Sequence, residues 1–149
     1  MSYKVEVHAA DLDWQIQALI IYPKIVNKHF YPAMHRSANA LVGAIEPNIP
    51  EKSGLLKSRF RKAVSGKGLF ITARVGFANF VGVSYVIPLE YGAQPHEIGY
   101  VPSLDVSIRM HPGISARGFM AHGLEQAQSE IDNEMDIALR GVVNELGKD

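Results

Sequence analysis

The chain has 149 residues, with 15 Lys plus Arg, 15 Asp plus Glu and no cysteine. Apolar residues at 47% and charged residues at 20% are typical of a folded domain and exclude a wholly disordered chain. Zero net charge excludes a summed field that would hold the chain on DNA or an anionic membrane, and the lack of cysteine excludes disulfides, thiolate nucleophiles and cysteine-based zinc sites. We expect a single domain over residues 1–149, with no leader peptide, and no membrane span because the longest apolar run is 18–22.

The first third of the chain predicts a short strand followed by two helices. Residues 3–8 alternate between apolar and polar side chains, which is the period of a half-buried strand. Asp11 is a candidate cap for a helix that ends near Pro23. A second helix is predicted from an apolar stripe that Pro32 kinks or breaks and that stops before Pro47; the stripe consists of Val26, Phe30, Met34, Ser37, Leu41 and Ile45.

The middle of the chain predicts a β-hairpin. Residues 47–53 have loop composition, and Gly54 closes the loop. Leu56, Phe60 and Val64 then fall on one face of a predicted strand, with basic residues on the other face. Glycines in residues 65–68 suit a tight turn, and residues 69–77 supply the antiparallel return strand.

The last third of the chain predicts an extended segment between two helices. Residues 78–93 mix helical and strand signals, and we favour a short helix there. Residues 93–117 predict an extended loop or hairpin that is functional or mobile, because long structureless loops are uncommon in compact domains. An apolar step of three or four residues from Leu124 to Leu146 predicts a long amphipathic C-terminal helix. The predicted class is α+β: N-terminal helices, an antiparallel hairpin or small sheet, and this long helix.

The neutral total hides two oppositely charged segments. Residues 51–76 carry 7 basic and 1 acidic side chains, whereas residues 117–149 carry 3 basic and 7 acidic ones. Three interpretations stand: a solvated strand face, contact with phosphates, or attraction to the acidic helix of a neighbouring copy. Self-assembly ranks above nucleic-acid binding because Phe60, one of two aromatic residues nearby, falls on the apolar face.

No pattern in the chain predicts catalysis. The six histidines lack metal-ligand spacing, which leaves His96, His111 and His122 as a weak metal candidate. The serines lack the nucleophile-elbow pattern, and residues 66–68 are too short for a phosphate-binding loop. Glu90 and Glu97 have nothing beside them in sequence to tune a carboxylate pair. We predict a protein that is not an enzyme and that binds no metal or cofactor.

Three stretches, in this order, resemble the tail-completion or head-tail joining family of tailed double-stranded DNA bacteriophages, whose members are similar to tail protein Z of phage lambda. Residues 49–58 resemble the family's Pro-x-x-Thr/Ser-Gly-x-Leu-Arg/Lys-Ser pattern, and residues 85–93 resemble Tyr-Ala-x-x-Val-Glu-x-Gly-Thr. Residues 117–124 resemble Arg-Pro-Phe-Leu-x-Pro-Ala-Leu and open the C-terminal helix. The chain departs from these patterns at Ala93, Gly118 and His122.

The resemblance implies a structural virion protein, assembled in the host cytoplasm, that forms a homohexameric ring at the top of the tail or in the neck. Its implied partners are its own copies, a tail terminator or tail tube protein, a head connector or head-closure protein, and genome DNA that passes through the lumen without sequence-specific binding. The alternatives are a tail terminator or head-closure ring and, ranked lower, a small nucleic-acid-binding protein that uses the basic hairpin. The candidate interface residues are Lys57, Arg59, Arg61, Glu90, His96, His111, Arg117, Phe119, Glu130 and Glu134.

Overall fold

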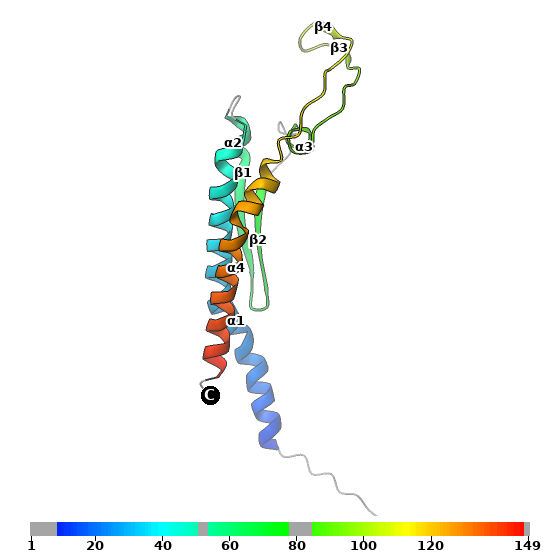
Figure 1. Cartoon of the computed structure of the whole chain (residues 1–149). Helices are drawn as coiled ribbons and strands as arrows, with labels where there is room; N and C mark the ends of the chain where they lie inside the picture. Colours follow the sequence, from blue (N-terminus) through cyan, green and yellow to red (C-terminus); the bar gives the residue numbers. More distant parts are fainter. Residues whose placement is uncertain (1–8, 51–53, 78–84, 148–149) are drawn as a thin grey trace, which may run out of the picture. The chain divides into compact units, whose positions relative to one another are not determined.

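The computed structural model describes residues 9–50, 54–77 and 85–147, with only the backbone described for residues 9–19 and Ile108. The elements in chain order are α1 (Ala9–Ile45), the 3₁₀ helix η1 (Glu46–Asn48), α2 (Leu55–Arg59), β1 (Phe60–Lys67), β2 (Phe70–Phe77), α3 (Val86–Tyr91), β3 (Gly99–Val101), β4 (Val106–Ile108) and α4 (Phe119–Leu146) (Figure 1). β1 pairs with β2, and β3 pairs with β4. The predicted α+β class, with a hairpin and a long C-terminal helix, is confirmed.

The chain divides into two compact units, which we describe separately. The first unit consists of Met1–Asn39, Lys62–Arg74 and Ser129–Asp149. The second unit consists of Ala40–Arg61 and Val75–Gln128. α1, the β1–β2 hairpin and α4 each contribute residues to both units.

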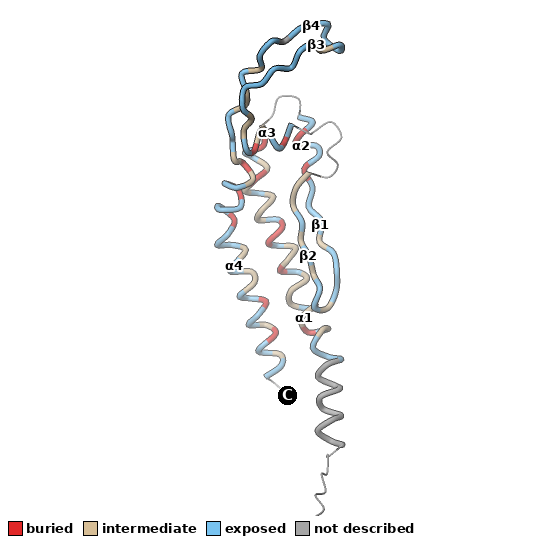
Figure 2. Tube along the Cα trace, turned by 90° about the vertical axis from the view of Figure 1, so that its right-hand side faces the viewer, coloured by how far each residue is buried: buried red, intermediate tan, exposed pale blue. Residues whose placement is uncertain are grey.

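The first unit is built on an antiparallel pair of helices. Lys28 and His29 of α1 contact Glu145 of α4, and Arg36, two turns further along α1, contacts Glu134. The contacts move toward the start of α4 as α1 advances, so the two helices run in opposite directions. The buried residues of this unit lie on these two helices, as the red segments of α1 and α4 in Figure 2 show. The small side chains among them allow the helices to approach closely. The buried residues are Ile25, Ala33, Ser37, Ala38, Ala138 and Val142.

The expectation of two N-terminal helices is wrong, because α1 continues through both Pro23 and Pro32. Asp11 is not its cap, since the helix begins two residues earlier at Ala9. A proline inside a helix costs about 3 kcal/mol, and tertiary packing of the buried α1 positions offsets that cost. Pro23 itself packs against the hairpin turn at Gly68, and the amide of Gly68 donates a 3.0 Å hydrogen bond to Asn27 Oδ1. The predicted strand over residues 3–8 lies outside the described residues.

Ser37 is a buried hydroxyl in this helix pair. Its side chain is 6% exposed, and its Oγ has no hydrogen-bond partner among the described residues. We expect Ser37→Ala to raise the free energy of unfolding by about 1 kcal/mol, because the variant no longer buries an unpaired polar group. Urea denaturation measures this change. Ser58→Ala is the control, since Ser58 Oγ donates to the Leu55 carbonyl at 2.7 Å and its loss should not stabilise the protein. A Ser37→Ala variant less stable than the parent would contradict the expectation.

The second unit has a core of aromatic and aliphatic side chains. Phe77 connects the sheet to the helices, because its ring centroid lies 5.3 Å from that of Phe60 and 6.2 Å from that of Phe119. The buried members come from five elements or their connections: Ile45, Ile49, Leu56, Phe60, Val86 and Phe119. α4 approaches α1 closely at Gly123, where an added Cβ would lie 3.0 Å from the Cα of Ile45.

Two boundaries in the hairpin differ from the sequence expectation. The predicted strand around Leu56 is the short helix α2, which begins after Gly54 with a positive φ of 70°. The turn consists of residues 68 and 69 rather than 65–68, so Gly66 and Lys67 belong to β1. Gly66 has a φ of 96° and its backbone lies against Phe70, which no residue with a Cβ would permit. The short helix expected within residues 78–93 is present as α3, while residues 78–84 lie outside the described residues.

Candidate functional site

Glu90 connects α3 to the first turn of α4. Its side chain is 7% exposed, and its carboxylate accepts hydrogen bonds from the backbone amides of Met120 and Ala121, each at 3.0 Å. α4 starts after Gly118, which has no side chain to cap the helix. Glu90 therefore supplies from another element the acceptor that an N-cap residue ordinarily provides, and its charge complements the helix dipole.

Backbone contacts reinforce this junction. The amide of Arg117 donates to the Leu89 carbonyl at 2.8 Å, and the amide of Gly118 donates to the Glu90 carbonyl at 3.1 Å. Gly92 has a φ of 81°, and a Cβ there would lie 3.0 Å from the Ile114 carbonyl oxygen. The second and third stretches of the family resemblance, residues 85–93 and 117–124, are thus bonded to each other.

The first stretch joins them at a surface pocket of about 610 Å³. Leu56, one of its lining residues, is buried, and Arg117 is the one charged residue among the lining residues that the structure describes. The guanidinium of Arg117 has no partner among the described residues. The lining draws on all three stretches and on the segment between the last two; it consists of Pro50, Leu55, Leu56, Tyr85, Leu89, Ile114 and Arg117.

Residues 93–114 form an antiparallel two-stranded arm, which we call the ribbon. Paired backbone hydrogen bonds join Ala93 to Ile114 and His96 to His111, and β3 pairs with β4 in the same register. Pro95 falls opposite Pro112 in this register, and because proline has no amide hydrogen the ladder is interrupted there. The ribbon exposes large apolar side chains, namely Ile98, Tyr100, Leu104, Val106 and Met110.

His96 and His111 lie together at the middle of the ribbon. Their rings stack with centroids 5.2 Å apart. His96 Nδ1 donates to the Gln94 carbonyl at 2.9 Å, whereas His111 Nδ1 accepts from the Gly113 amide at 3.1 Å. Among the described residues, no group of three or more His, Asp or Glu side chains could hold a metal ion. The pair is therefore a cross-strand contact that uses one nitrogen of each ring.

The tip of the ribbon has a defined conformation. The Leu104 amide donates to the Val101 carbonyl at 3.1 Å, and the Tyr100 hydroxyl donates to Asp105 Oδ1 at 2.7 Å. This hydrogen bond raises the pKa of the Tyr100 hydroxyl above its usual value. Asp105 has a φ of 50°, a left-handed conformation that aspartate tolerates better than most residues. Leu104 is 66% exposed at this tip. Neither Leu104 nor Asp105 is a candidate site residue on sequence alone.

The remaining predicted interface residues are dispersed. Lys57 and Arg59 lie on α2 rather than on a strand, and Arg61 on β1 donates to the Phe60 carbonyl at 2.9 Å. Phe119 is only 2% exposed, so it belongs to the core rather than to an exposed surface. On α4, Glu130 is exposed and Glu134 forms a 2.7 Å ion pair with Arg36.

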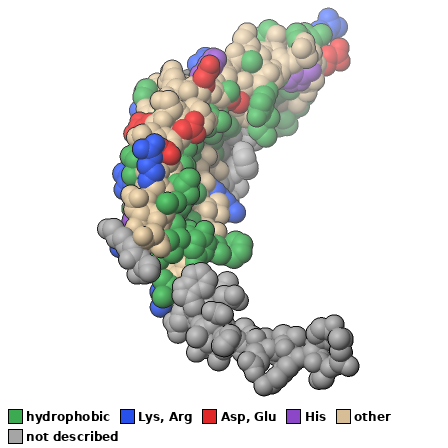
Figure 3. Space-filling model, turned by 60° about the horizontal axis from the view of Figure 1, so that its bottom comes forward, with side chains coloured by type: hydrophobic (Ala, Val, Ile, Leu, Met, Phe, Trp, Pro, Cys, Tyr) green, Lys and Arg blue, Asp and Glu red, His purple; other side chains and the backbone are tan. Residues whose placement is uncertain are grey.

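The first unit also exposes apolar side chains, around the hairpin turn and the last turns of α4 (Figure 3). Phe70 in the hairpin is 84% exposed, the highest value among the large hydrophobic residues whose side chains the structure describes. Exposed apolar surface of this kind is typical of protein–protein contacts. The other members described in this unit are Ile20, Ile21, Tyr22, Leu69, Ile137, Leu139, Val143 and Leu146.

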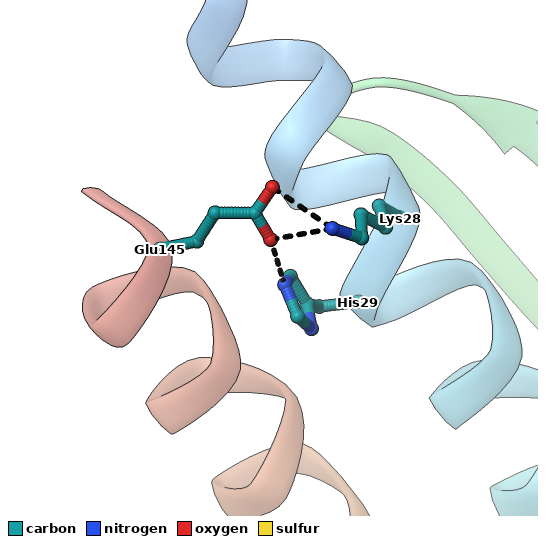
Figure 4. A network of polar contacts seen from close by, with 3 residues as sticks. All are labelled: Lys28, His29 and Glu145. Atoms are coloured by element: carbon teal, nitrogen blue, oxygen red, sulfur yellow. Dashed lines mark hydrogen bonds and ion pairs between the residues drawn. The ribbon is translucent and has the colours of Figure 1, made fainter. Parts of the chain in front are cut away.

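A polar network that sequence analysis missed joins α1 to the end of α4. Lys28 Nζ lies 2.9 and 2.8 Å from the two carboxylate oxygens of Glu145, and His29 Nε2 lies 2.7 Å from Oε2 (Figure 4). The hydrogen bonds from Lys28 and then His29 lower the pKa of the Glu145 carboxyl. The partners are 116 and 117 residues apart, so no local sequence pattern could have predicted them.

Glu145 predicts a pH-dependent contribution to stability. Its pKa is lower in the folded protein than in the unfolded chain, so its stabilising effect is complete above the unfolded value and disappears as pH falls through the folded value. We expect Glu145→Gln to be less stable than the parent at pH 7, with the two proteins converging as pH falls below about 4. Thermal unfolding from pH 7 to pH 3 measures the difference. The control is Glu125→Gln, on the exposed surface of α4, and a pH-independent difference for Glu145→Gln would contradict the expectation.

No helix in the described part of the chain is long and apolar enough to cross a membrane. The chain matches no protein-family model, and searches of curated proteins and of solved structures returned no similar protein or structure.

Proposed function

We propose that this protein is a structural virion protein of a tailed double-stranded DNA phage, forming a ring at the tail top or neck that completes the tail and joins it to the head. The observation that supports the proposal most is the junction in the second unit. Glu90, from one family-like stretch, caps the helix opened by another, and residues of the third stretch line the same pocket. Three short patterns separated by tens of residues are more informative when they meet in space than when they stand alone.

The surface supports a role based on interfaces. A two-stranded ribbon alone in water is marginally stable at best, and this ribbon exposes five large apolar side chains. Burying them against neighbouring subunits would stabilise both the ribbon and the assembly. Attraction between the basic segment of one copy, residues 51–76, and the acidic α4 of another copy would add to these contacts in a ring of identical subunits.

A tail terminator or head-closure ring is the alternative from the same junction of the virion, and it makes the same demands on the subunit surface. Nucleic-acid binding is the lower-ranked alternative. It is supported by the exposed Arg59, Arg61 and Lys62 and by the exposed ring of Phe70. A DNA titration at low salt tests it: tight, salt-sensitive binding would favour this alternative over the proposed structural role.

A complementation assay tests the proposal: the gene for this protein is inactivated in the phage, the parent protein or a variant is supplied in trans, and the joining of heads to tails is measured. The parent protein should restore joining, whereas a variant that lacks residues 96–112 should leave separate heads and tails. Leu104→Ser tests the role of the ribbon in joining without deleting it, because a substitution at an exposed residue should leave the fold intact. Normal particles without any copy of the protein would overturn the proposal.

A further inference from the structure

The ribbon carries complementary features at its two ends. The pocket lies at its base, since Ile114 and Arg117 belong to the pocket lining and Ile114 pairs with Ala93 in the first bridge of the ribbon. Leu104 and Asp105 form the tip, beyond the last pair of β3 and β4. Val101 is eight positions beyond Ala93, which is about 26 Å at 3.3 Å per residue.

The chemistry of the two ends matches. The described lining of the pocket is apolar except for the Tyr85 hydroxyl and the guanidinium of Arg117, which has no partner among the described residues. At about 610 Å³ the pocket is large enough to accept several side chains. The tip presents the exposed Leu104 next to the carboxylate of Asp105, whose Oδ1 accepts from Tyr100 and whose Oδ2 has no partner among the described residues. An apolar anchor beside an acid therefore fits an apolar pocket beside a cation.

We infer that the ribbon tip of one copy binds the ribbon-base pocket of a second copy, with Leu104 in the apolar pocket and Asp105 paired with Arg117. The tip does not reach its own pocket, because the ribbon between them is extended and its two strands keep one register from the Ala93–Ile114 bridge to the Val101–Val106 pair. The contact joins two different surfaces, so it is heterologous and propagates from copy to copy into a closed ring or a filament. The role of this contact in the virion rests on the proposed function: it would be the contact between neighbouring subunits that closes the proposed ring.

The conformation of the tip supports this role. The hydrogen bond from Tyr100 and the left-handed Asp105 fix the turn before any partner arrives, which reduces the entropy lost on binding. A tip that served only to reverse the chain would not need to expose a leucine. The pocket is equally prepared, since the Leu89 carbonyl and Glu90 hold the backbone of residues 117–121 in place.

Cysteine cross-linking tests the contact, because the chain contains no cysteine of its own. One protein carries Leu104→Cys at the tip, and another carries Leu55→Cys at the pocket, where Leu55 is 39% exposed. After mixing and mild oxidation, we expect at least fivefold more disulfide-linked heterodimer than in a control mixture of Leu124→Cys, which is 47% exposed on α4, with Leu55→Cys. Equal yields in the two mixtures, or Leu104→Cys dimers linked tip to tip as the main product, would overturn the inference.

Charge variants in the same assay test the polar half of the contact. Arg117→Gln in the pocket partner and Asp105→Asn in the tip partner should each lower the heterodimer yield several-fold, and together they should lower it no further than either does alone. Asparagine also tolerates the left-handed conformation of residue 105, so a lower heterodimer yield for Asp105→Asn would result from the lost negative charge. If the two substitutions lowered the heterodimer yield independently and additively, the pairing of Asp105 with Arg117 would be overturned. If the protein forms rings in electron micrographs but the tip-to-pocket cross-link does not form, the inferred contact is refuted and the proposed function is not. If the cross-link forms but the protein has no part in head-tail joining, the proposed function is refuted and the inferred contact is not.

Discussion

Replacing Glu90 with alanine is expected to lower the free energy of unfolding by about 3 kcal/mol, one of the largest effects of any single substitution in the second unit. The carboxylate accepts two amide hydrogen bonds at the start of α4 while only 7% exposed. Its removal leaves the amides of Met120 and Ala121 without their protein acceptor and removes a negative charge from the positive end of the helix dipole. Thermal unfolding measures the loss, which corresponds to roughly 6–12 °C in melting temperature.

Two further variants separate the causes of the Glu90 effect. Glu90→Gln should lose about 1–2 kcal/mol, because the amide oxygen still accepts one hydrogen bond while its NH₂ group faces the other donor. Glu97→Ala, at an exposed site on the ribbon, should stay within about 0.5 kcal/mol of the parent. A Glu90→Ala protein as stable as the Glu97→Ala control would contradict the capping role.

Gly123→Ala is expected to destabilise the protein by about 1–3 kcal/mol, although alanine is the better helix former. An added Cβ would lie 3.0 Å from the Cα and 3.2 Å from the Cβ of Ile45, which is 1% exposed and has no room to move. The two helices would have to separate where Gly123 faces Ile45. Urea denaturation measures the loss.

Gly43→Ala is the matched control for Gly123→Ala. Gly43 is also in a helix and is exposed, with nothing within 4 Å of an added Cβ. This substitution should therefore stabilise the protein by about 0.5–1 kcal/mol. Opposite signs at the two glycines would support the close approach of α1 and α4, and stabilisation at both would contradict it.

Spacing in the sequence predicted the class of the fold but left some element types undecided. The step from Leu56 to Phe60 is four residues, which fits both the two-residue period of a strand and one turn of a helix. Leu56 lies in α2 and Phe60 begins β1, and both are buried. The pattern identified the buried face correctly and the secondary structure only from Phe60 onward.

The prolines of α1 were misread for a different reason. Propensity correctly assigns each proline a cost, but the benefit that offsets it comes from residues more than a hundred positions away. Ile25 and Ala33 are buried in the unit that includes the last turns of α4, where Ala138 and Val142 are also buried. The residues near Pro23 and Pro32 in sequence therefore could not predict this packing.

The candidate site was also predictable from sequence only in part. Glu90 is a candidate interface residue from sequence because it falls within a family-like stretch, residues 85–93. A buried carboxylate that caps backbone amides is chemically ordinary, but the sequence does not show which amides it meets. The described contacts do not include an ion pair between Glu90 and Arg117, because the Glu90 carboxylate accepts from the α4 amides of Met120 and Ala121. Leu104 and Asp105 acquire significance only when the register of the ribbon places them at one end and the pocket at the other.

Electron microscopy of the purified protein and of its parent particle tests the proposed function most directly. We expect closed rings of six copies in the purified sample, and a ring of the same size at the head-proximal end of the tail in the particle. Added salt should dissociate the free rings if attraction between the basic segment and the acidic helix contributes to them. A protein that stays monomeric at high concentration and is missing from the junction of head and tail would contradict the account.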